Sequence, residues 1–210
     1  MQGKMFITFE GADGSGKSTA ITFAKDYLMS LGYKVHATRN PGGTELGIRL
    51  REILLNYDGE VEPLAEMLMF LADRAQHVSK EIKPLLEQGY IVLCDRYIDS
   101  TVAYQGYGRD LSIQQIETMN SIATQNLKPD LTLLFNISTE IAMQRIDSTR
   151  TKDRLESEMS EFHHKVALGY LEIARKEPER FTIIDANKAL EKVQIQVKKA
   201  IEVFFSLKAL

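Results

Sequence analysis

Short runs of consecutive apolar residues alternate along the chain with longer stretches in which apolar residues recur every three or four positions. The short runs predict strands at residues 5–10, 34–38, 90–94, 131–137 and 181–185. The longer stretches predict helices at residues 17–31, 45–56, 63–88, 112–126, 139–148, 158–176 and 189–207. The near-continuous apolarity of IVLC and LTLLF is typical of strands that are covered on both faces. The pattern therefore predicts an α/β fold, a five-stranded parallel sheet with helices on both faces.

Two segments interrupt this alternation. RNPGGTE, residues 39–45, concentrates turn-forming residues directly after a predicted strand. DSTRTKDRLESE, residues 147–158, is charged and lacks an apolar stripe, which is typical of a surface loop or of a lid. The sequence contains no internal repeat, low-complexity tract or Pro/Gly-rich linker. It therefore predicts a single domain over residues 1–210, with a lid segment at about 147–158.

Composition narrows the class of protein. The 210 residues are 44% hydrophobic and 26% charged, and the formal net charge of −3 gives no indication of a nucleic-acid partner. No apolar run approaches the roughly 18 residues of a membrane span, and no signal peptide precedes the first strand. The lone Cys94 suits a reducing cytosol and is interpreted as an inert strand residue. The histidines lack metal-ligand spacing. We expect a cytoplasmic protein with no membrane or nucleic-acid partner.

A phosphate loop is the clearest motif. GADGSGKS, residues 11–18, matches GxxxxGK[ST] and lies between a predicted strand and a predicted helix, which is the required context. Its backbone N–H groups and the helix N-terminus can hold phosphate oxygens, Lys17 can reach the β- and γ-phosphates, and Ser18 can bind Mg²⁺. The predicted residues of the ATP site are Gly11, Ala12, Asp13, Gly14, Ser15, Gly16, Lys17, Ser18 and Thr19.

The third strand ends in IVLCDRY. Asp95 can hold Mg²⁺ through water, and Arg96 directs a guanidinium toward the same place, as a second phosphate-bearing substrate would require. The alternative interpretation is a simple ion pair at the end of a strand. The sequence has no guanine-reading NKxD motif, which disfavours a GTPase, and no Asp-Glu strand end of the kind found in motor ATPases. The pattern favours a kinase.

Five motifs extend the comparison over nearly the whole chain. FEGADGSGKST, TRNPGGT, LMFLADRAQH, DRYIDSTVAYQGYGR and KPDLTLLFNIS stand in the order and spacing of the bacterial thymidylate kinases, which this sequence resembles from residue 5 to about 186. The resemblance implies a P-loop nucleoside-monophosphate kinase fold, a homodimer, and transfer of the γ-phosphate of ATP to dTMP with Mg²⁺ in dTTP synthesis.

The resemblance also implies roles for individual residues. Those assigned to dTMP are Asp13, Arg39, Arg51, Phe70, Arg74, Arg96, Ser100, Tyr104 and Gln105. In this assignment Arg39, Arg51 and Arg96 hold the phosphate, while Phe70 stacks on the base and Arg74 meets its O4. Phe70 and Arg74 are four residues apart on a predicted helix, so both can reach one pocket. For Phe70 taken alone, packing in the core is the alternative.

The catalytic charge is assigned to Lys17, Arg96, Asp95 and the lid. Some thymidylate kinases place a basic residue just after the acidic residue of the phosphate loop, whereas here that position is Gly14. The lid therefore becomes the source of the arginine, and we expect Arg150 to act on the transferring phosphate. Arg154 is the alternative, and Arg145 and Arg154 are also assigned to the ATP site.

One position departs from the family pattern. TREPGG is usual, whereas here Asn40 follows the arginine, and its role is open. The resemblance alone predicts that Asn40→Glu is tolerated or mildly activating. Two other functions also remain open, a kinase for a deoxynucleoside or another pyrimidine monophosphate, and a regulatory nucleotide-binding protein without turnover. A phosphate acceptor is already anionic and needs no strong base, which fits the absence of a candidate catalytic histidine.

Overall fold

A computed structural model describes residues 4–147 and 153–208. Its strands are β1 (Met5–Gly11), β2 (Val35–Arg39), β3 (Ile91–Asp95), β4 (Leu131–Asn136) and β5 (Phe181–Asp185). Its helices are α1 (Lys17–Ser30), α2 (Glu45–Asn56), α3 (Pro63–His77), η1 (Val78–Ile82), α4 (Lys83–Glu87), α5 (Ile98–Thr101), η2 (Val102–Gly108), α6 (Ile113–Thr124), α7 (Thr139–Asp147), α8 (Ser160–Lys176) and α9 (Leu190–Lys208), of which η1 and η2 are π-helical. Every predicted strand boundary is confirmed to within one residue.

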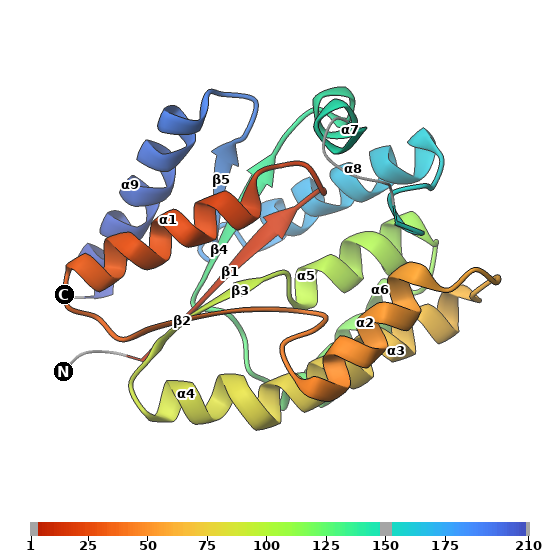
Figure 1. Ribbon diagram of the computed structural model, residues 1–210, viewed down its shortest axis with the longest axis horizontal. Coiled ribbons are helices and arrows are strands. Elements are labelled where there is room, and N and C mark those ends of the chain that lie inside the picture. Colours follow the sequence, from red (N-terminus) through yellow and green to blue (C-terminus); the bar gives the residue numbers. More distant parts are fainter. Residues whose placement is uncertain (1–3, 148–152, 209–210) are drawn as a thin grey trace.

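The strands of the described chain form one parallel sheet in the order β2-β3-β1-β4-β5. Figure 1 shows α1 and α9 on one face of this sheet, and α3 to α6 with α8 on the other. Alternate residues of the central strands enter the two layers: Ile7 and Phe9 pack under α1 and α9, while Phe6 packs with η1 and α4. The predicted fold class, a parallel sheet covered on both faces, is confirmed.

The helical prediction for residues 63–88 is confirmed in extent, but the structure adds a detail. α3, η1 and α4 follow one another without a break, and the π-helical turn at residues 78–82 lies between two α-helical parts. The predictions missed α5 and η2, which occupy residues 98–108. Cys94 is a buried residue of β3, as predicted, and burial raises the pKa of its thiol well above the usual value.

Because every strand of the sheet is parallel, the carboxyl ends of β1, β2 and β3 meet at one edge. β1 leads there into the phosphate loop, β2 ends at Arg39, and β3 ends at Asp95. Ligands of open α/β sheets bind at this edge. In the described part of the chain, no helix is long and apolar enough to cross a membrane.

Candidate active site

The phosphate loop wraps around the ammonium group of Lys17. The Lys17 side chain is only 6% exposed, and its Nζ donates to the carbonyl oxygens of Gly11 at 3.0 Å and Ala12 at 2.7 Å. Gly14 has a φ of +75°, and a Cβ added there would lie 2.4 Å from the carbonyl oxygen of Ala142, so the turn requires glycine. This loop fixes a buried positive charge beside the N-terminus of α1.

A cavity of about 430 Å³ opens in front of this loop. It is lined by Asp13, Gly14, Gly16, Lys17, Ser18, Thr19, Asp95, Arg145 and Ile146, which include most of the predicted ATP-site residues. Arg145 reaches it from α7 and donates to the carbonyl oxygens of Gly14 at 3.3 Å and Ala186 at 3.2 Å. The structure therefore brings Arg145 to the phosphate loop, as the assignment requires.

The side chain of Asp95 fits the predicted magnesium site. Its Oδ1 is buried and has no hydrogen-bond partner among the described residues. Ser18 lines the same cavity. The described residues contain no cluster of three or more acidic, His or Cys side chains that could hold a metal alone. Mg²⁺ usually takes only one or two protein oxygens beside water and substrate phosphates, so the residues present fit this ion.

A second pocket lies on the other side of Asp13. It is lined by Asp13, Asn40, Pro41, Arg51, Leu55, Phe70, Arg74, Arg96, Ser100, Thr101, Tyr104, Gln105, Asp153 and Leu155. All of the residues assigned to dTMP are in this set except Arg39. Arg39 lies at the exposed end of β2, where its charge and that of Arg96 add to burial in lowering the pKa of Arg51. Arg39 and Arg96 are thus both close enough to Arg51 for their charges to act on it.

Arg96 lies between the two cavities. Its Nη2 is 2.8 Å from Asp13 Oδ1 and 3.0 Å from the Tyr104 hydroxyl, and the guanidinium lies over the Tyr104 ring. Although burial acts to raise the pKa of Asp13, the charges of Arg96 and Lys17 outweigh it and hold that pKa below its usual range. Asp13 therefore stays ionised and is a weak base at neutral pH.

Phe70 and Arg74 both reach the second pocket from α3, as their spacing predicts. Phe70 is half-buried and belongs to none of the hydrophobic clusters of the described chain, which favours a role in the pocket over core packing. Arg74 is 1% exposed and donates to Asn40, Thr101, Asn120 and the Tyr97 carbonyl oxygen. A base oxygen would have to share one of these N–H groups.

Asn40 joins two side chains of opposite charge. Its Oδ1 accepts from Arg74 Nε at 3.0 Å and Nη2 at 2.7 Å, and its Nδ2 donates to the carboxylate of Asp73. Burial raises the pKa of Asp73, and the backbone N–H of Gly42 and the nearby positive side chains act against this shift. An amide can accept from the arginine and donate to the carboxylate at once, whereas an ionised carboxylate can only accept.

This contact argues against the expectation that Asn40→Glu is tolerated, because a carboxylate at position 40 would lie close to that of Asp73. We predict that Asn40→Asp raises the KM for dTMP about tenfold at pH 8, since like charges disfavour two neighbouring ionised carboxylates. The increase should shrink toward pH 6, where the pair can share a proton. Steady-state kinetics at both pH values measure this, and a KM equal to that of the wild type at pH 8 would contradict it.

The lid prediction is only partly covered by the structure. Arg150 lies outside the described residues. Arg154 lies against α2 and α3, where its Nη2 is 2.6 Å from Glu66 Oε2 and its Nε donates to the Leu54 carbonyl oxygen. Glu66, fully buried, also accepts from Gln105 at 2.8 Å and from Arg109 at 3.2 Å. In this structure Arg154 contacts the acceptor side of the protein and not the phosphate loop.

Comparison with known proteins places this site in a family. The thymidylate kinase family model matches residues 9–197. The chain belongs to the thymidylate kinase family. It is 47% identical to the thymidylate kinase of Desulfovibrio desulfuricans over 95% of this chain and 96% of the relative, and 48% identical to that of Pelotomaculum thermopropionicum over 96% and 94%. The crystal structure of thymidylate kinase from Ehrlichia chaffeensis superposes with a TM-score of 0.78 at 36% identity, over 95% of this chain and 99% of that one.

Membership in the thymidylate kinase family confirms the resemblance that the motifs indicated. Sequence reasoning nevertheless missed several residues around the site. Tyr170 of α8 contacts both Arg96 and Ser100, and Glu66 holds Gln105 in the wall of the acceptor pocket. Both residues lie outside the motifs, and no spacing in the sequence connects them to the residues that they contact.

Proposed function

We propose that this protein transfers the γ-phosphoryl group of ATP to the phosphate of dTMP, giving dTDP and ADP. The observation that carries the proposal is that Asp13 lines both cavities, with Lys17 on one side and Arg96 beside it on the other. A triphosphate on the loop and a monophosphate in the second pocket would meet at this shared wall. Membership in the thymidylate kinase family supports dTMP as the acceptor.

The chemistry at this junction is alignment and neutralisation of charge. Lys17 and the N-terminus of α1 hold the donor phosphates, and Arg96 with Arg51 holds the acceptor phosphate. Bringing two anions together is the main barrier, and fixed positive groups lower it. Mg²⁺, held by Ser18 and through water by Asp95, would neutralise donor charge. We also propose that Arg150 supplies charge to the transferring group from the lid at residues 147–158.

Asp13 disfavours the alternative of a deoxynucleoside kinase. A hydroxyl acceptor needs a base to take its proton, and Asp13, the carboxylate that lines both cavities, is ion-paired to Arg96 with a lowered pKa. We further propose that residues 1–210 act as one kinase domain. The three hydrophobic clusters of the described chain all include residues of the same sheet, which supports this.

An ADP-release assay tests the function. ATP and Mg²⁺ with dTMP should release ADP rapidly, whereas thymidine, or no acceptor, should give little release. Release with thymidine equal to that with dTMP would identify a nucleoside kinase, and release independent of any acceptor would identify an ATPase. No release with any acceptor would favour the regulatory nucleotide-binding protein.

Phe70 provides a prediction for base recognition. Phe70→Ala should raise the KM for dTMP about 5- to 150-fold, because stacking on an aromatic side chain is worth roughly 1–3 kcal/mol per base. Its effect on the KM for ATP should be small. Steady-state kinetics with each substrate varied in turn measure both constants. An unchanged KM for dTMP would return Phe70 to a packing role.

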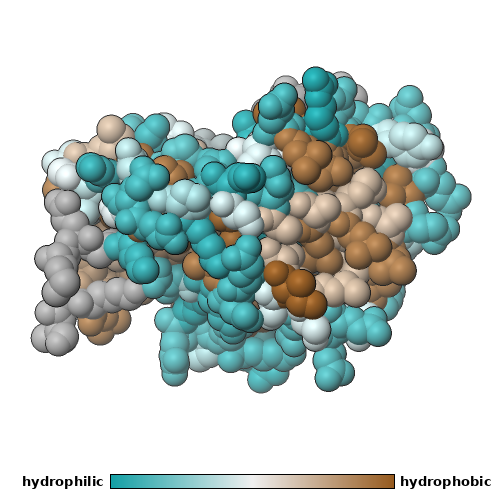
Figure 2. All heavy atoms as spheres, turned by 90° about the horizontal axis from the view of Figure 1, so that it is seen from below, coloured by the Kyte–Doolittle hydropathy of each residue, from teal (hydrophilic) through white to brown (hydrophobic). Residues whose placement is uncertain are grey.

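We also propose that the protein is a homodimer, with the outer face of α3 in the interface. Leu64 and Leu68 lie one turn apart on this helix and are 53% and 48% exposed, and Ile122 of the neighbouring α6 is 74% exposed. Figure 2 shows hydrophobic side chains gathered on the side of the molecule where α2, α3 and α6 lie in Figure 1. A contiguous apolar surface of this kind is typical of an interface.

Light scattering should therefore give twice the chain mass of 23.8 kDa. Leu68→Arg should give a monomer, because the charge would be buried in the interface without a partner. Met29→Arg is the matched control: Met29 is 52% exposed on α1, in the other helical layer, and the dimer should persist. A wild-type protein that scatters as a monomer at assay concentration would refute the dimer.

A further inference from the structure

The guanidinium of Arg96 is held by hydroxyl groups as well as by Asp13. Arg96 Nη1 donates to Ser100 Oγ at 3.1 Å and to the Tyr170 hydroxyl at 3.0 Å, while Nη2 donates to the Tyr104 hydroxyl at 3.0 Å. These partners come from α5, α8 and η2. The hydroxyls are neutral and can accept from the guanidinium in only some orientations of their own protons. Something must therefore set the direction of those protons.

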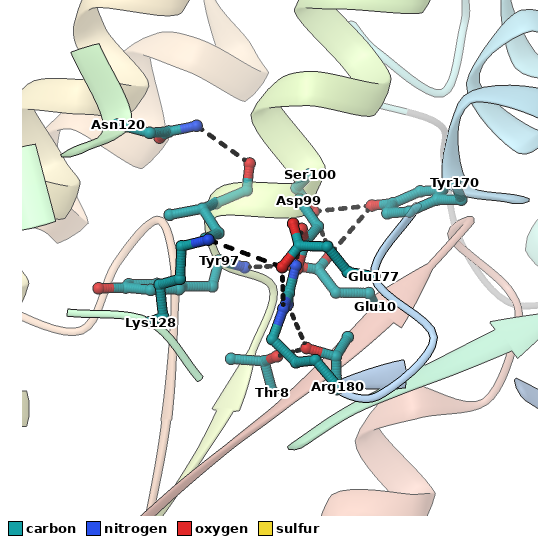
Figure 3. Close-up of polar contacts among 12 residues, drawn as sticks. Thr8, Glu10, Tyr97, Asp99, Ser100, Asn120, Lys128, Tyr170, Glu177 and Arg180 are labelled. Atoms are coloured by element: carbon teal, nitrogen blue, oxygen red, sulfur yellow. Dashed lines mark hydrogen bonds and ion pairs between the residues drawn. The ribbon is translucent and has the colours of Figure 1, made fainter. Parts of the chain in front are cut away.

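Glu10 lies directly behind two of these hydroxyls. It belongs to β1 and is 0% exposed, and its carboxylate accepts from Ser100 Oγ at 2.6 Å, from the Tyr170 hydroxyl at 3.1 Å and from the Tyr97 backbone N–H at 2.7 Å. Figure 3 shows the carboxyl group and the two hydroxyls pointing toward one another from separate elements. An ionised carboxylate can only accept, so the hydroxyl protons turn toward it and their lone pairs are left for Arg96.

We propose that Glu10 is a positioning residue for the acceptor phosphate, which fixes the guanidinium of Arg96 through the hydroxyls of Ser100 and Tyr170. The proposal rests on the proposed function, in which Arg96 binds the phosphate of dTMP. Glu10 does not line the acceptor pocket or the cavity at the phosphate loop. Its influence on phosphate therefore passes through Arg96, by way of the two hydroxyls and the attraction between the opposite charges of Glu10 and Arg96.

The electrostatic surroundings of Glu10 explain why its carboxylate needs several hydrogen-bond donors. Burial raises the pKa of Glu10 and the negative charge of Asp99 adds to this, while Ser100, Arg96 and the Tyr97 N–H act to lower it. A buried carboxylate is costly unless it is hydrogen-bonded and near a positive charge. The hydrogen bonds that oppose this rise in the pKa of Glu10 are thus the same contacts that orient the hydroxyls.

A neighbouring carboxylate provides a matched control. Asp99 is 2% exposed and lies in the same polar cluster, but its oxygens accept from Arg180 at 2.8 and 2.9 Å (Figure 3). Loss of the charge at Asp99 should destabilise the fold, because Arg180 loses its buried ion pair and keeps only Glu177 and Thr132 as hydrogen-bond partners among the described residues. It should leave the orientation of Arg96 unchanged. Comparing the Asp99 variant with the Glu10 variant thus separates two effects. One is the loss of a buried charge, and the other is the loss of the hydrogen bonds that connect Glu10 to Arg96 through Ser100 and Tyr170.

The experiment compares binding of dTMP with binding of thymidine, which lacks the phosphate, by calorimetry. Their ratio of dissociation constants isolates the phosphate contribution. Glu10→Gln should shrink this ratio roughly tenfold or more, because a misplaced guanidinium loses charge-assisted hydrogen bonds, while thymidine affinity changes less than about twofold. Asp99→Asn should lower the melting temperature and keep the wild-type ratio. Tyr170→Phe, which removes one hydroxyl of the relay, should shrink the ratio in the same direction.

A second measurement tests the route. When Ser100→Ala and Tyr170→Phe are combined, adding Glu10→Gln should shrink the ratio far less than it does in the wild-type protein, because both hydrogen-bonded links to Arg96 are already gone. A folded Glu10→Gln variant with the wild-type ratio would overturn the proposal. If that variant does not fold, a wild-type ratio in the Ser100→Ala, Tyr170→Phe double variant overturns it equally. A wild-type protein that neither phosphorylates dTMP nor prefers it to thymidine would instead refute the proposed function.

Discussion

Replacing Lys17 with alanine will lower kcat about 10³-fold, while the fold stays intact. The effect is large because a fixed positive charge on the transferring group stabilises charge that develops only in the transition state. The Lys17 ammonium is buried within the phosphate loop, 2.7 Å from the Ala12 carbonyl oxygen, so no other lysine can take its place. Steady-state kinetics give kcat, and circular dichroism monitors the fold.

The matched control for this variant is Lys25→Ala. Lys25 lies on the same helix, α1, two turns beyond the loop, and lines neither cavity. Its removal should leave kcat within about twofold of wild type, as expected for a surface change away from the site. Wild-type turnover in Lys17→Ala would show that the loop does not hold the phosphate that is transferred.

Replacing Arg96 with alanine is expected to lower kcat/KM for dTMP about 10³-fold or more, in the range seen when arginines leave phosphoryl-transfer sites. Arg96 serves several hydrogen-bond partners with one planar group, and its loss also leaves Asp13 without its ion pair. Arg96→Lys should restore little of the activity, because a point charge cannot reproduce the planar fork. The KM for ATP should change far less than the KM for dTMP.

Arg175→Ala is the control for this loss. Arg175 is an exposed residue of α8 that is paired with Glu172 one turn away, and its removal should leave kcat/KM at the wild-type value. Full recovery of kcat/KM in Arg96→Lys would contradict the proposed geometry. Equal increases in both KM values in Arg96→Ala would mean that the variant disturbs the whole site and not the acceptor phosphate alone.

The strands and the phosphate loop could be predicted because their signals are local. β5 follows directly from the run FTIID, and the loop from GADGSGKS. Residues 98–108 could not, because α5 and η2 carry no clear apolar stripe and depend on packing against α8. A Cβ added at Gly169 would lie 2.7 Å from the Tyr107 ring, so η2 and α8 can pack this closely only with glycine at this position. No pattern in the sequence predicts a contact of this kind between two helices.

The residues of the site also fall into two groups, those that the sequence predicts and those that it does not. The motifs identified most of the pocket lining because each motif is contiguous, and Phe70 and Arg74 are one turn apart. The groups that hold this lining in place are distant in sequence. Glu10 and Tyr170 are 160 residues apart, and Asn40 and Asp73 are 33 apart. A single sequence contains no information on such pairs until the fold brings them together.

The contacts of Glu66 bear on how the segment of the chain that carries Arg154 can move away from the acceptor pocket. Two arginines share this one carboxylate, Arg154 from the predicted lid segment and Arg109 from the end of η2. If the segment that carries Arg154 moves away, Arg109 and Gln105 still bind Glu66, so the buried carboxylate keeps hydrogen-bond partners. The guanidinium of Arg154 becomes hydrated when it leaves Glu66. Release of Arg154 would therefore cost one ion pair to a fully buried acid, which keeps Arg109 and Gln105 as partners.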